Sequence, residues 1–265
     1  MKIKREVQNM TLADFCKYLD EILEPENFKS DISLNGLQVQ NNDIDSPIHK
    51  VAFAVDACYE SVKLSCEQNA DVLVVHHGFF WGKPLAVTGC HYKTLNLMMQ
   101  NNLALYACHI PLDANKEVGN NYGLARRIGL EESSLKEFGQ WRGMNIGVKG
   151  SFAQGVTLEQ VESLLFMPGE KPLSILPFGK NIIKTVGIIS GGAAEEVSDA
   201  IEENLDLYIT GEVTHQIYHQ CLENRINFIA GGHYNTETVG VSLLKKLIEE
   251  ETNLETVFID VPTGL

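Results

Sequence analysis

The sequence predicts an α/β protein made of two similar lobes, with a smaller α+β element inserted between them. Two observations predict this class. Short apolar runs rich in β-branched residues alternate with helical patterns, which is typical of parallel sheets with crossover helices. This alternation occupies both ends of the chain and is interrupted in the middle by turn residues and glycine. The predicted ranges are 1–129 for the first lobe, 130–183 for the insert and 184–265 for the second lobe.

The first lobe opens with a helical stripe that follows the N-cap residue Thr11 and stops at Pro25. The turn signal Asn35-Gly36 then precedes a short loop or edge strand. The lobe continues as alternating strands and helices, with expected ranges 51–55, 59–68, 72–75, 92–101 and 103–107.

The insert combines turn residues with a glycine-punctuated strand at 144–148, a helix after Thr157 and a Pro/Gly-rich stretch at 167–179. It contains no histidine. We interpret it as a structural or assembly element rather than a catalytic one.

The second lobe returns to the first pattern, with a Gly191-Gly192 turn between its first strand and helix. The expected strands and helices are 185–190, 193–204, 206–210, 215–223 and 226–230. A strongly amphipathic helix then reaches about residue 250, and a strand at 256–260 closes the chain.

The two lobes share an internal repeat. The segment 51–71 recurs as 186–206 with the same spacing, and this offset places Glu212 opposite His77. At a somewhat smaller offset, a motif of histidine, three residues and a carboxylate occurs once in each lobe. Duplication of a half-domain explains these matches. The alternative is that any α/β protein repeats this rhythm.

Composition and charge limit the function. The 265 residues, 44% hydrophobic and 21% charged, suffice for one large or two ordinary domains. No run is long enough to span a bilayer, residues 1–6 lack the apolar stretch of a signal peptide, and the six cysteines form no CxxC pair. We therefore expect a cytoplasmic protein with reduced thiols and no membrane partner. The formal charge of −14 argues against nucleic acid as a partner.

The strongest functional signal is the stretch from Asp71 to Trp81, a buried strand that leads into His76, His77 and Gly78. Ligands of open α/β sheets bind beyond the carboxyl ends of the strands, and histidine is the commonest protein ligand of metals. In the alternative interpretation, one histidine caps the strand and the other faces solvent. Adjacent strand residues point opposite ways, so we expect each histidine to bind a different metal ion.

Five residues form a mixed imidazole and carboxylate set: His76, His77, Asp113, His233 and Glu237. These donors suit zinc, iron, manganese or cobalt and lack the thiolates of a structural zinc site. Five ligands exceed what one ion with open positions needs, and they match two ions that activate a bound water. His233 and Glu237 lie one helical turn apart and can reach a common point. Taken alone, Glu237 would be a helix N-terminal charge and Asp113 a loop cap.

Two further residues are predicted to be catalytic. His109 is either a metal ligand or an acid–base group, and we favour proton transfer. Glu212 either lines the same cleft or simply ends a strand. Gly191-Gly192 resembles a phosphate-binding turn, although a plain turn explains it equally well. The aromatic residues 79–81 either cover a cleft or belong to the core or a subunit interface.

These motifs together resemble the Nif-three-like dinuclear metal-centre family, whose members are often labelled GTP cyclohydrolase 1 type 2 homologues. The resemblance runs nearly end to end. It is carried by Asn35-Gly-Leu-Gln, Asp71-Val-Leu-Val-Val-His-His-Gly, His109-Ile-Pro-Leu-Asp113-Ala, Gly119-Asn-Asn-Tyr-Gly, Thr210-Gly-Glu-Val-Thr-His, Gly231-Gly-His-Tyr-Asn-Thr-Glu237 and Phe258-Ile-Asp-Val-Pro. Where the family often has Ala-Gly-His, this chain has Gly-Gly-His.

The resemblance implies a ligand set, an assembly and an architecture. The family's ligands match His76, His77, Asp113, His233 and Glu237, with Asp113 and Glu237 as the bridging pair. The family also implies two divalent transition-metal ions between two α/β lobes, and assembly into ring-like homohexamers.

The predicted function is that of a metal-dependent hydrolase acting on a small, nucleotide-like substrate through a metal-bridging hydroxide. In a GTP cyclohydrolase, hydroxide would attack C8 of the purine while His109 or Glu212 moves protons. The alternative is a metal-binding or metal-delivery protein without turnover. An open coordination position beside His109 and Glu212 favours the enzyme, and a buried site without titratable neighbours favours the alternative.

Overall fold

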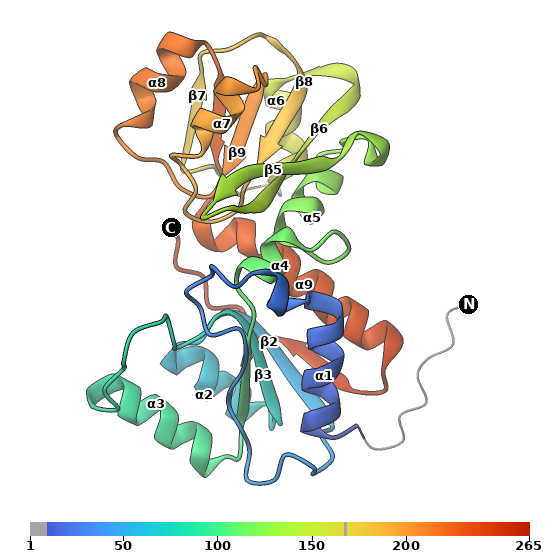
Figure 1. Ribbon diagram of the computed structural model, residues 1–265, viewed down its shortest axis with the longest axis vertical. Helices are drawn as coiled ribbons and strands as arrows, with labels where there is room; N and C mark the ends of the chain where they lie inside the picture. Colours follow the sequence, from blue (N-terminus) through green and yellow to red (C-terminus); the bar gives the residue numbers. More distant parts are fainter. Residues whose placement is uncertain (1–9, 167–168) are drawn as a thin grey trace. The chain divides into compact units, whose positions relative to one another are not determined.

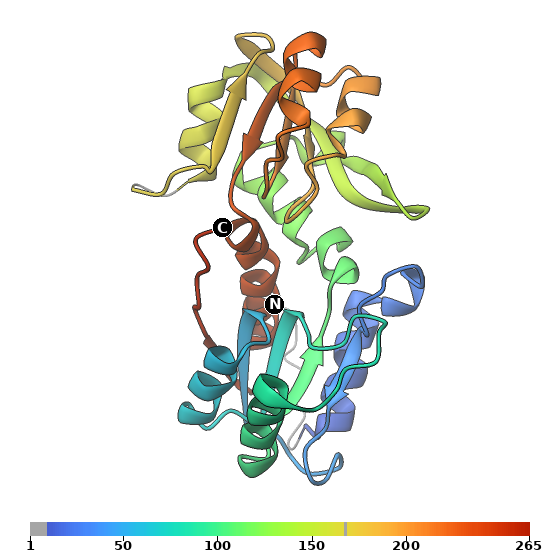
Figure 2. The same ribbon diagram turned by 90° about the vertical axis from the view of Figure 1, so that its left-hand side faces the viewer.

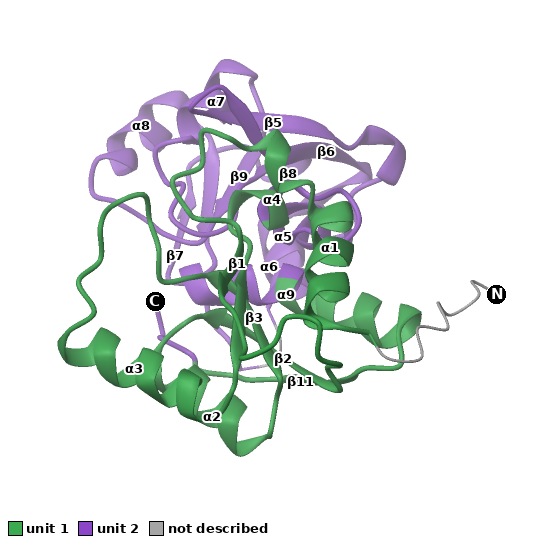
Figure 3. Ribbon diagram, turned by 60° about the horizontal axis from the view of Figure 1, so that its bottom comes forward, with its two compact units in different colours: residues 1–112, 241–261 green, residues 113–240, 262–265 purple. Residues whose placement is uncertain are grey.

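The computed structural model describes residues 10–166 and 169–265 (Figure 1). Residues 1–6, on which the signal-peptide prediction rests, and residues 167–168 of the Pro/Gly-rich stretch lie outside the described residues. The chain forms two compact units, which Figure 3 colours separately. Unit 1 comprises, in its described part, residues 10–112 and 241–261, and unit 2 comprises residues 113–240 and 262–265.

Unit 1 is built on a five-stranded sheet with the strand order β1-β4-β3-β2-β11. The strands are β1 (Gly36–Val39), β2 (Lys50–Asp56), β3 (Val72–His77), β4 (Ala104–Ala107) and β11 (Glu255–Phe258). All are parallel except β1, which pairs antiparallel with β4 at one edge. Because β3 lies between two parallel neighbours and is covered on both faces, its sequence is continuously apolar. It extends two residues beyond the predicted strand, through His76 and His77.

Helices cover both faces of this sheet (Figure 1). They are α1 (Leu12–Leu23), α2 (Tyr59–Glu67) and α3 (Gly89–Gln100), with the 3-10 turn η1 (Pro25–Asn27) after α1. Leu95 and Met98 of α3 join side chains of α2 and of one sheet face in a buried apolar cluster. On the opposite face, the Tyr106 hydroxyl donates to Asp20 of α1 at 2.6 Å. The sheet of unit 1 is therefore buried between two helical layers.

The helix cap predicted at the start of unit 1 agrees with the structure, but two short helices after β4 were not predicted. Thr11 caps α1, because its side chain accepts the N–H of Asp14 at 3.1 Å. Asp113 lies in the short helix α4 (Ile110–Ala114), where no helix was predicted. Helix α5 (Asn120–Arg127), which carries the Asn-Asn-Tyr-Gly motif, follows in unit 2.

Unit 2 is built on a six-stranded sheet with the strand order β5-β6-β8-β9-β10-β7. The strands are β5 (Lys136–Trp141), β6 (Met144–Thr157), β7 (Ser174–Pro177), β8 (Ile182–Ile188), β9 (Leu207–Thr210) and β10 (Asn227–Ala230). The central strands β8, β9 and β10 are parallel, whereas β6 and β7 flank them antiparallel. Strands of the range 130–183 thus extend the sheet of the range 184–265. The three predicted domain ranges stay a prediction.

Helices also cover both faces of the unit 2 sheet, as Figure 2 shows. They are α5, α6 (Leu158–Leu165), α7 (Val197–Glu202) and α8 (Ile217–Asn224), with the 3-10 turn η2 (Glu132–Ser134). Helices α5 and α6 share one face, and α7 and α8 share the other. The long helix α9 (His233–Glu251) begins in unit 2 and ends in unit 1. Within the described residues, no helix combines the length and apolar content needed to cross a membrane.

One hydrogen-bond pattern occurs in both units at positions that the internal repeat aligns. In unit 1, Asp71 Oδ2 accepts the backbone N–H groups of residues 49–50 at 2.6 and 2.9 Å. In unit 2, Asp206 Oδ2 accepts those of residues 184–185 at 2.9 and 3.1 Å. Each carboxylate lies just before one strand and binds backbone N–H groups of the parallel neighbour or of the residue before it. The shared pattern supports the predicted duplication, which stays a prediction.

Candidate metal centre

The carboxyl end of β3 places His76 and His77 at the sheet edge where loops of an α/β unit gather. His76 is fully buried and His77 is half-buried. Their ring centroids lie 4.5 Å apart, with an angle of 47° between the ring planes. The rings therefore converge, and the expectation that they point opposite ways is wrong. Alternation sets only the direction in which each side chain leaves the strand, and the hydrogen bonds that each ring makes at Nδ1 set where the ring lies.

His109 joins these two histidines in unit 1. It follows β4, the parallel neighbour of β3, and its ring centroid lies 5.2 Å from that of His76 and 5.7 Å from that of His77. The three residues offer ligand atoms that all lie within 4.8 Å of one another. This imidazole cluster has the composition of a metal site, and His109 lies close enough to the predicted ligands to take part in their chemistry.

Hydrogen bonds to Nδ1 fix the orientation of the two predicted ligands. His76 Nδ1 lies 3.0 Å from the backbone carbonyl oxygen of Cys108, and His77 Nδ1 lies 2.8 Å from Asp56 Oδ1. Because a carbonyl and a carboxylate only accept hydrogen bonds, the Nδ1 of each ring carries a proton, and the predicted role as a metal ligand falls to Nε2. Acceptors in this position are typical of metal-binding histidines.

His109 is held in the same way by Asp31. Asp31 Oδ1 lies 3.0 Å from His109 Nδ1, and the side-chain oxygen of Asn35 accepts the backbone N–H of His109 at 2.8 Å. The Asp31 side chain is completely buried. Burial by itself raises the pKa of this carboxyl group, but hydrogen bonds and charge from His109, with hydrogen bonds from Asn35 and Ser33, lower the pKa of Asp31 to about 2. Asp31 is therefore ionised at neutral pH.

Trp81 packs against the imidazole cluster. Its indole N–H donates to the carbonyl of Gly78 at 2.9 Å, and its ring centroid lies 5.0 Å from that of His109 and 5.7 Å from that of His77. At Gly78 a Cβ would overlap the side-chain amide of Gln38, which accepts the N–H of Phe79 at 2.8 Å. Trp81 therefore lies beside the imidazole cluster, and the roles considered for residues 79–81 stay predictions.

Asp113 is the first predicted donor of unit 2. It is buried in α4, and its Oδ1 accepts hydrogen bonds from Asn120 Nδ2 at 2.8 Å and from Ser190 Oγ at 2.9 Å. Both donors are neutral, so they orient the carboxylate without cancelling its charge. Asp113 thus has the properties of a preoriented anionic ligand.

The first turn of α9 brings the other predicted donors of unit 2 together. His233 Nε2 lies 3.2 Å from Glu237 Oε1, and His233 Nδ1 lies 2.6 Å from Glu212 Oε1. Burial disfavours the charged imidazole, but hydrogen bonds and charges from Glu237 and Glu212 outweigh it and raise the pKa of His233 to about 9. A metal cation would compete with this proton for the same carboxylates. Glu212 therefore touches a predicted ligand directly.

Gly191 leaves the space in which these donors lie. Its φ is +66°, and a Cβ at this position would overlap Glu237 Oε1 and lie 3.3 Å from His233 Nε2. Its backbone N–H donates to Thr236 Oγ1 at 3.0 Å. This hydrogen bond argues against a phosphate-binding role for that N–H. The glycine is needed here because any side chain would displace a predicted ligand.

Gly191→Ala is expected to weaken zinc binding by about 10–100-fold, because the new methyl group pushes Glu237 and His233 out of place. Competition with a chromogenic chelator measures the affinity. Gly192→Ala is the matched control, since a Cβ there would lie 3.5 Å from the Glu212 carboxylate, an ordinary contact. Equal zinc affinities for the two variants would contradict this role of Gly191.

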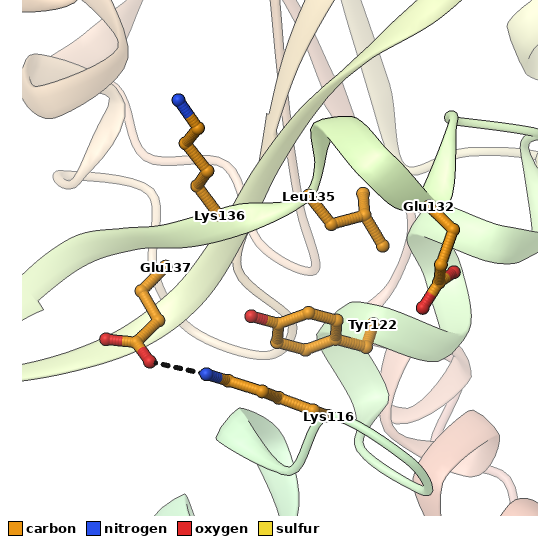
Figure 4. Close-up of a pocket in the computed structure, with 6 residues that line it drawn as sticks. All are labelled: Lys116, Tyr122, Glu132, Leu135, Lys136 and Glu137. Carbon is orange, nitrogen blue, oxygen red and sulfur yellow. Dashed lines mark ion pairs between the residues drawn. The ribbon is translucent and has the colours of Figure 1, made fainter.

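A surface pocket of about 440 Å³ lies in another part of unit 2 (Figure 4). Its lining residues are Lys116, Tyr122, Glu132, Leu135, Lys136 and Glu137. Lys116 and Glu137 form an ion pair at 2.9 Å, and Figure 4 shows the Tyr122 ring between Lys116 and Leu135. None of the predicted site residues lines this pocket, so it forms no part of the candidate metal centre.

Sequence reasoning missed the two carboxylates that orient histidines of unit 1. Asp56 carried a usable signal, because it ends β2 and lies in register with His77 on the neighbouring strand. Asp31 carried none, because it lies 78 residues before His109 in an irregular segment. Only the folded chain brings Asp31 and His109 together.

Comparison with known proteins places this chain in a family. The model of Duf34/NIF3 (NGG1p interacting factor 3) matches residues 10–264. A protein of Treponema pallidum (strain Nichols) named GTP cyclohydrolase 1 type 2 homolog is 40% identical over 290 residues, covering 97% of this chain and 100% of that protein. A protein of Archaeoglobus fulgidus with the same name is 38% identical over 256 residues, with the same two coverages.

A solved structure gives the same result. The protein TTHA1606 from Thermus thermophilus matches with a TM-score of 0.86 and 39% sequence identity, covering 97% of this chain and 100% of that one. The family resemblance and the α/β fold class expected from the motifs are thereby confirmed. The chain belongs to the Duf34/NIF3 family.

Proposed function

We propose that the chain binds two divalent transition-metal ions and acts as a metal-dependent hydrolase on a small, nucleotide-like substrate. The proposed ligands are His76, His77, Asp113, His233 and Glu237. The observation that carries the proposal is the orientation of the donors within each unit, where every ligand histidine has an acceptor on Nδ1 and the two carboxylates are buried. The names of the relatives support a nucleotide-like substrate.

The donor chemistry fits the proposed ions. The set contains imidazoles and carboxylates without a thiolate, which suits zinc, iron, manganese or cobalt. Gly191 leaves space beside Glu237 that any side chain would fill. When bound, two such ions would activate a water molecule and stabilise the negative charge that develops on the substrate.

We propose His109 and Glu212 for proton transfer. Asp31 occupies His109 Nδ1, so Nε2 is the nitrogen that can accept a proton. The Glu212 side chain is 47% exposed and contacts His233 Nδ1, which gives it a second task in orienting that ligand. These titratable groups beside the proposed ligands favour turnover over metal delivery.

Protein purified without added metal or chelator is expected to contain about two transition-metal ions per chain and to consume GTP in a metal-dependent way. Elemental analysis gives the first number, and chromatography of GTP with each metal found gives the second. Two bound ions without loss of GTP would support the metal centre and reject GTP as the substrate. A screen of other nucleotide-like metabolites would then distinguish a hydrolase with another substrate from a metal-delivery protein. No bound metal after reconstitution with zinc, iron, manganese and cobalt would contradict the proposal.

The homohexameric ring and the cytoplasmic location stay predictions. The ring rests on the family resemblance, and light scattering on the eluted protein would measure the mass of the assembly directly. A mass near that of one 29.4 kDa chain would reject the ring.

A further inference from the structure

We propose that Asp31 is a positioning residue that holds His109 in a single tautomer, with the proton on Nδ1 and the lone pair on Nε2. The catalytic meaning of this tautomer rests on the function proposed above. The tautomer itself is independent of turnover and can be measured without a substrate.

Four donors surround the Asp31 carboxylate. Oδ1 accepts from His109 Nδ1 and from the backbone N–H of Ser33, both at 3.0 Å. Oδ2 accepts from Asn35 Nδ2 at 2.9 Å and from the backbone N–H of Ile110 at 3.2 Å. Three of these partners cannot act as acceptors in these contacts, because two are backbone N–H groups and one is an amide N–H. The carboxylate is thus held in one orientation.

This orientation determines where the proton of His109 lies. A buried carboxylate that only accepts requires a hydrogen on the imidazole nitrogen that faces it. The backbone of the same residue is fixed independently, since Asn35 accepts the His109 N–H at 2.8 Å. Main chain and ring are therefore both anchored to the segment 31–35, and Nε2 is the nitrogen of His109 that remains for chemistry.

The surroundings of the ring make this nitrogen important. The His109 ring centroid lies 5.2 Å from that of His76, 5.7 Å from that of His77 and 5.0 Å from that of Trp81. A lone pair on Nε2 in this cluster can accept a proton or bind a cation, whereas an N–H at the same place can do neither. Asp31 therefore decides which of two opposite chemical properties His109 shows beside the proposed ligands.

A comparison with Asp43 separates this role from ordinary loop capping. Asp43 also accepts from nearby groups, the N–H of Asp45 at 3.1 Å and the hydroxyl of Ser46 at 2.9 Å, but those partners are local and exposed. Asp31 instead reaches partners 78 and 79 residues away, and its side chain is completely buried. A carboxylate needed only to shape its own loop would require neither the burial nor the distant partners.

Asp31→Asn is the variant that tests the proposal, because an amide has one accepting oxygen and one donating nitrogen. An amide nitrogen facing His109 meets one donor, the N–H of Ser33, and it forces the ring to accept at Nδ1 and moves the proton to Nε2. The opposite amide orientation would face the nitrogen toward the N–H of Ile110 and Asn35 Nδ2, two donors. The same exchange of Asp for Asn in an Asp–His pair is known to leave a catalytic histidine in the wrong tautomer.

The experiment is nitrogen-15 NMR on full-length protein labelled at its histidines, recorded after chelator treatment and again with Zn²⁺. His109→Gln identifies the His109 signals among those of the eight histidines. We expect wild-type His109 to show Nδ1–H, and Asp31→Asn to lose that signal and gain Nε2–H. Asp43→Asn is the matched control and leaves the His109 signals unchanged. Where GTP loss is found, Asp31→Asn lowers it by about 10²–10⁴-fold.

Two results would overturn the proposal: Nε2–H as the neutral form of wild-type His109, or His109 signals that do not change in Asp31→Asn. The wild-type spectrum decides the question by itself if the variant does not fold. Absence of bound metal or of turnover would reject the proposed function and not the tautomer, so the two failures are distinguishable.

Discussion

The double variant His76→Ala/Glu237→Ala is expected to lose its bound metal ions while the fold survives. The two changes remove one proposed ligand from each unit and leave three ligands for two ions, too few to hold both. Both side chains are buried, but neither belongs to the buried apolar side chains that form the cores. Mass spectrometry of the metal content and circular dichroism of the variant measure the two outcomes.

The control for this variant exchanges the same residue types elsewhere. The side chain of His49 is 82% exposed and that of Glu250 is 61% exposed, so His49→Ala/Glu250→Ala should keep two ions per chain. Retention of two metal equivalents by His76→Ala/Glu237→Ala would reject the ligand assignment. Loss of metal from both double variants would show a non-specific effect and count against the assignment as well.

Asp206→Ala is expected to lower the free energy of unfolding by about 2–4 kcal/mol. The Asp206 side chain is only 6% exposed, and it accepts two backbone N–H groups, which the variant leaves without this acceptor. Asp71→Ala removes the same pattern in unit 1, where the side chain is 38% exposed, so water can replace it and a loss of about 1 kcal/mol is expected. Urea unfolding of both variants measures the difference.

The loss in Asp206→Ala should depend on pH. Burial raises the pKa of Asp206, but the ion pair with Lys180 and the hydrogen bonds from residues 184–185 lower it below the ordinary value of 3.8. A carboxyl group with a lowered folded-state pKa stabilises the protein above its unfolded pKa and loses that effect as pH falls. The difference in the free energy of unfolding between wild type and Asp206→Ala should therefore become smaller below about pH 4. Equal losses of unfolding free energy for Asp71→Ala and Asp206→Ala would contradict the expectation that the more buried carboxylate contributes more to stability.

The parallel cores of both units could be predicted because their signals are local. The apolar run of β3 and the helical stripe after Thr11 each lie within a dozen residues, and each formed where the pattern indicated. The pairing of β6 with β8, and of β7 with β10, could not be predicted. These antiparallel strands join the sheet through backbone hydrogen bonds, which leave little trace in the side-chain pattern.

The sequence predicted the residues that offer donor atoms in the candidate site, but it did not predict the residues that orient those donors. His76 and His77 have the residue type and strand-end position of ligands, so sequence reasoning reached them. Of the carboxylates that orient the rings, Asp56 shares the strand-end position, but Asp31 does not, and an aspartate in an irregular segment usually caps a turn. The expected opposite orientation of the two histidines was wrong, because hydrogen bonds at Nδ1 to Cys108 and Asp56 set where the rings lie, and strand alternation does not foresee them.

The acceptors that orient the three histidines of unit 1 differ in how mutation can remove them. His76 bonds to the backbone carbonyl of Cys108, which persists whatever side chain occupies that position. The other two rings depend on the side chains of Asp56 and Asp31, which a single-base change can convert to asparagine. Genetic drift would therefore release those rings first and leave His76 in place. Positions 31 and 56 are where selection has to act for the site to persist, although neither is a proposed ligand.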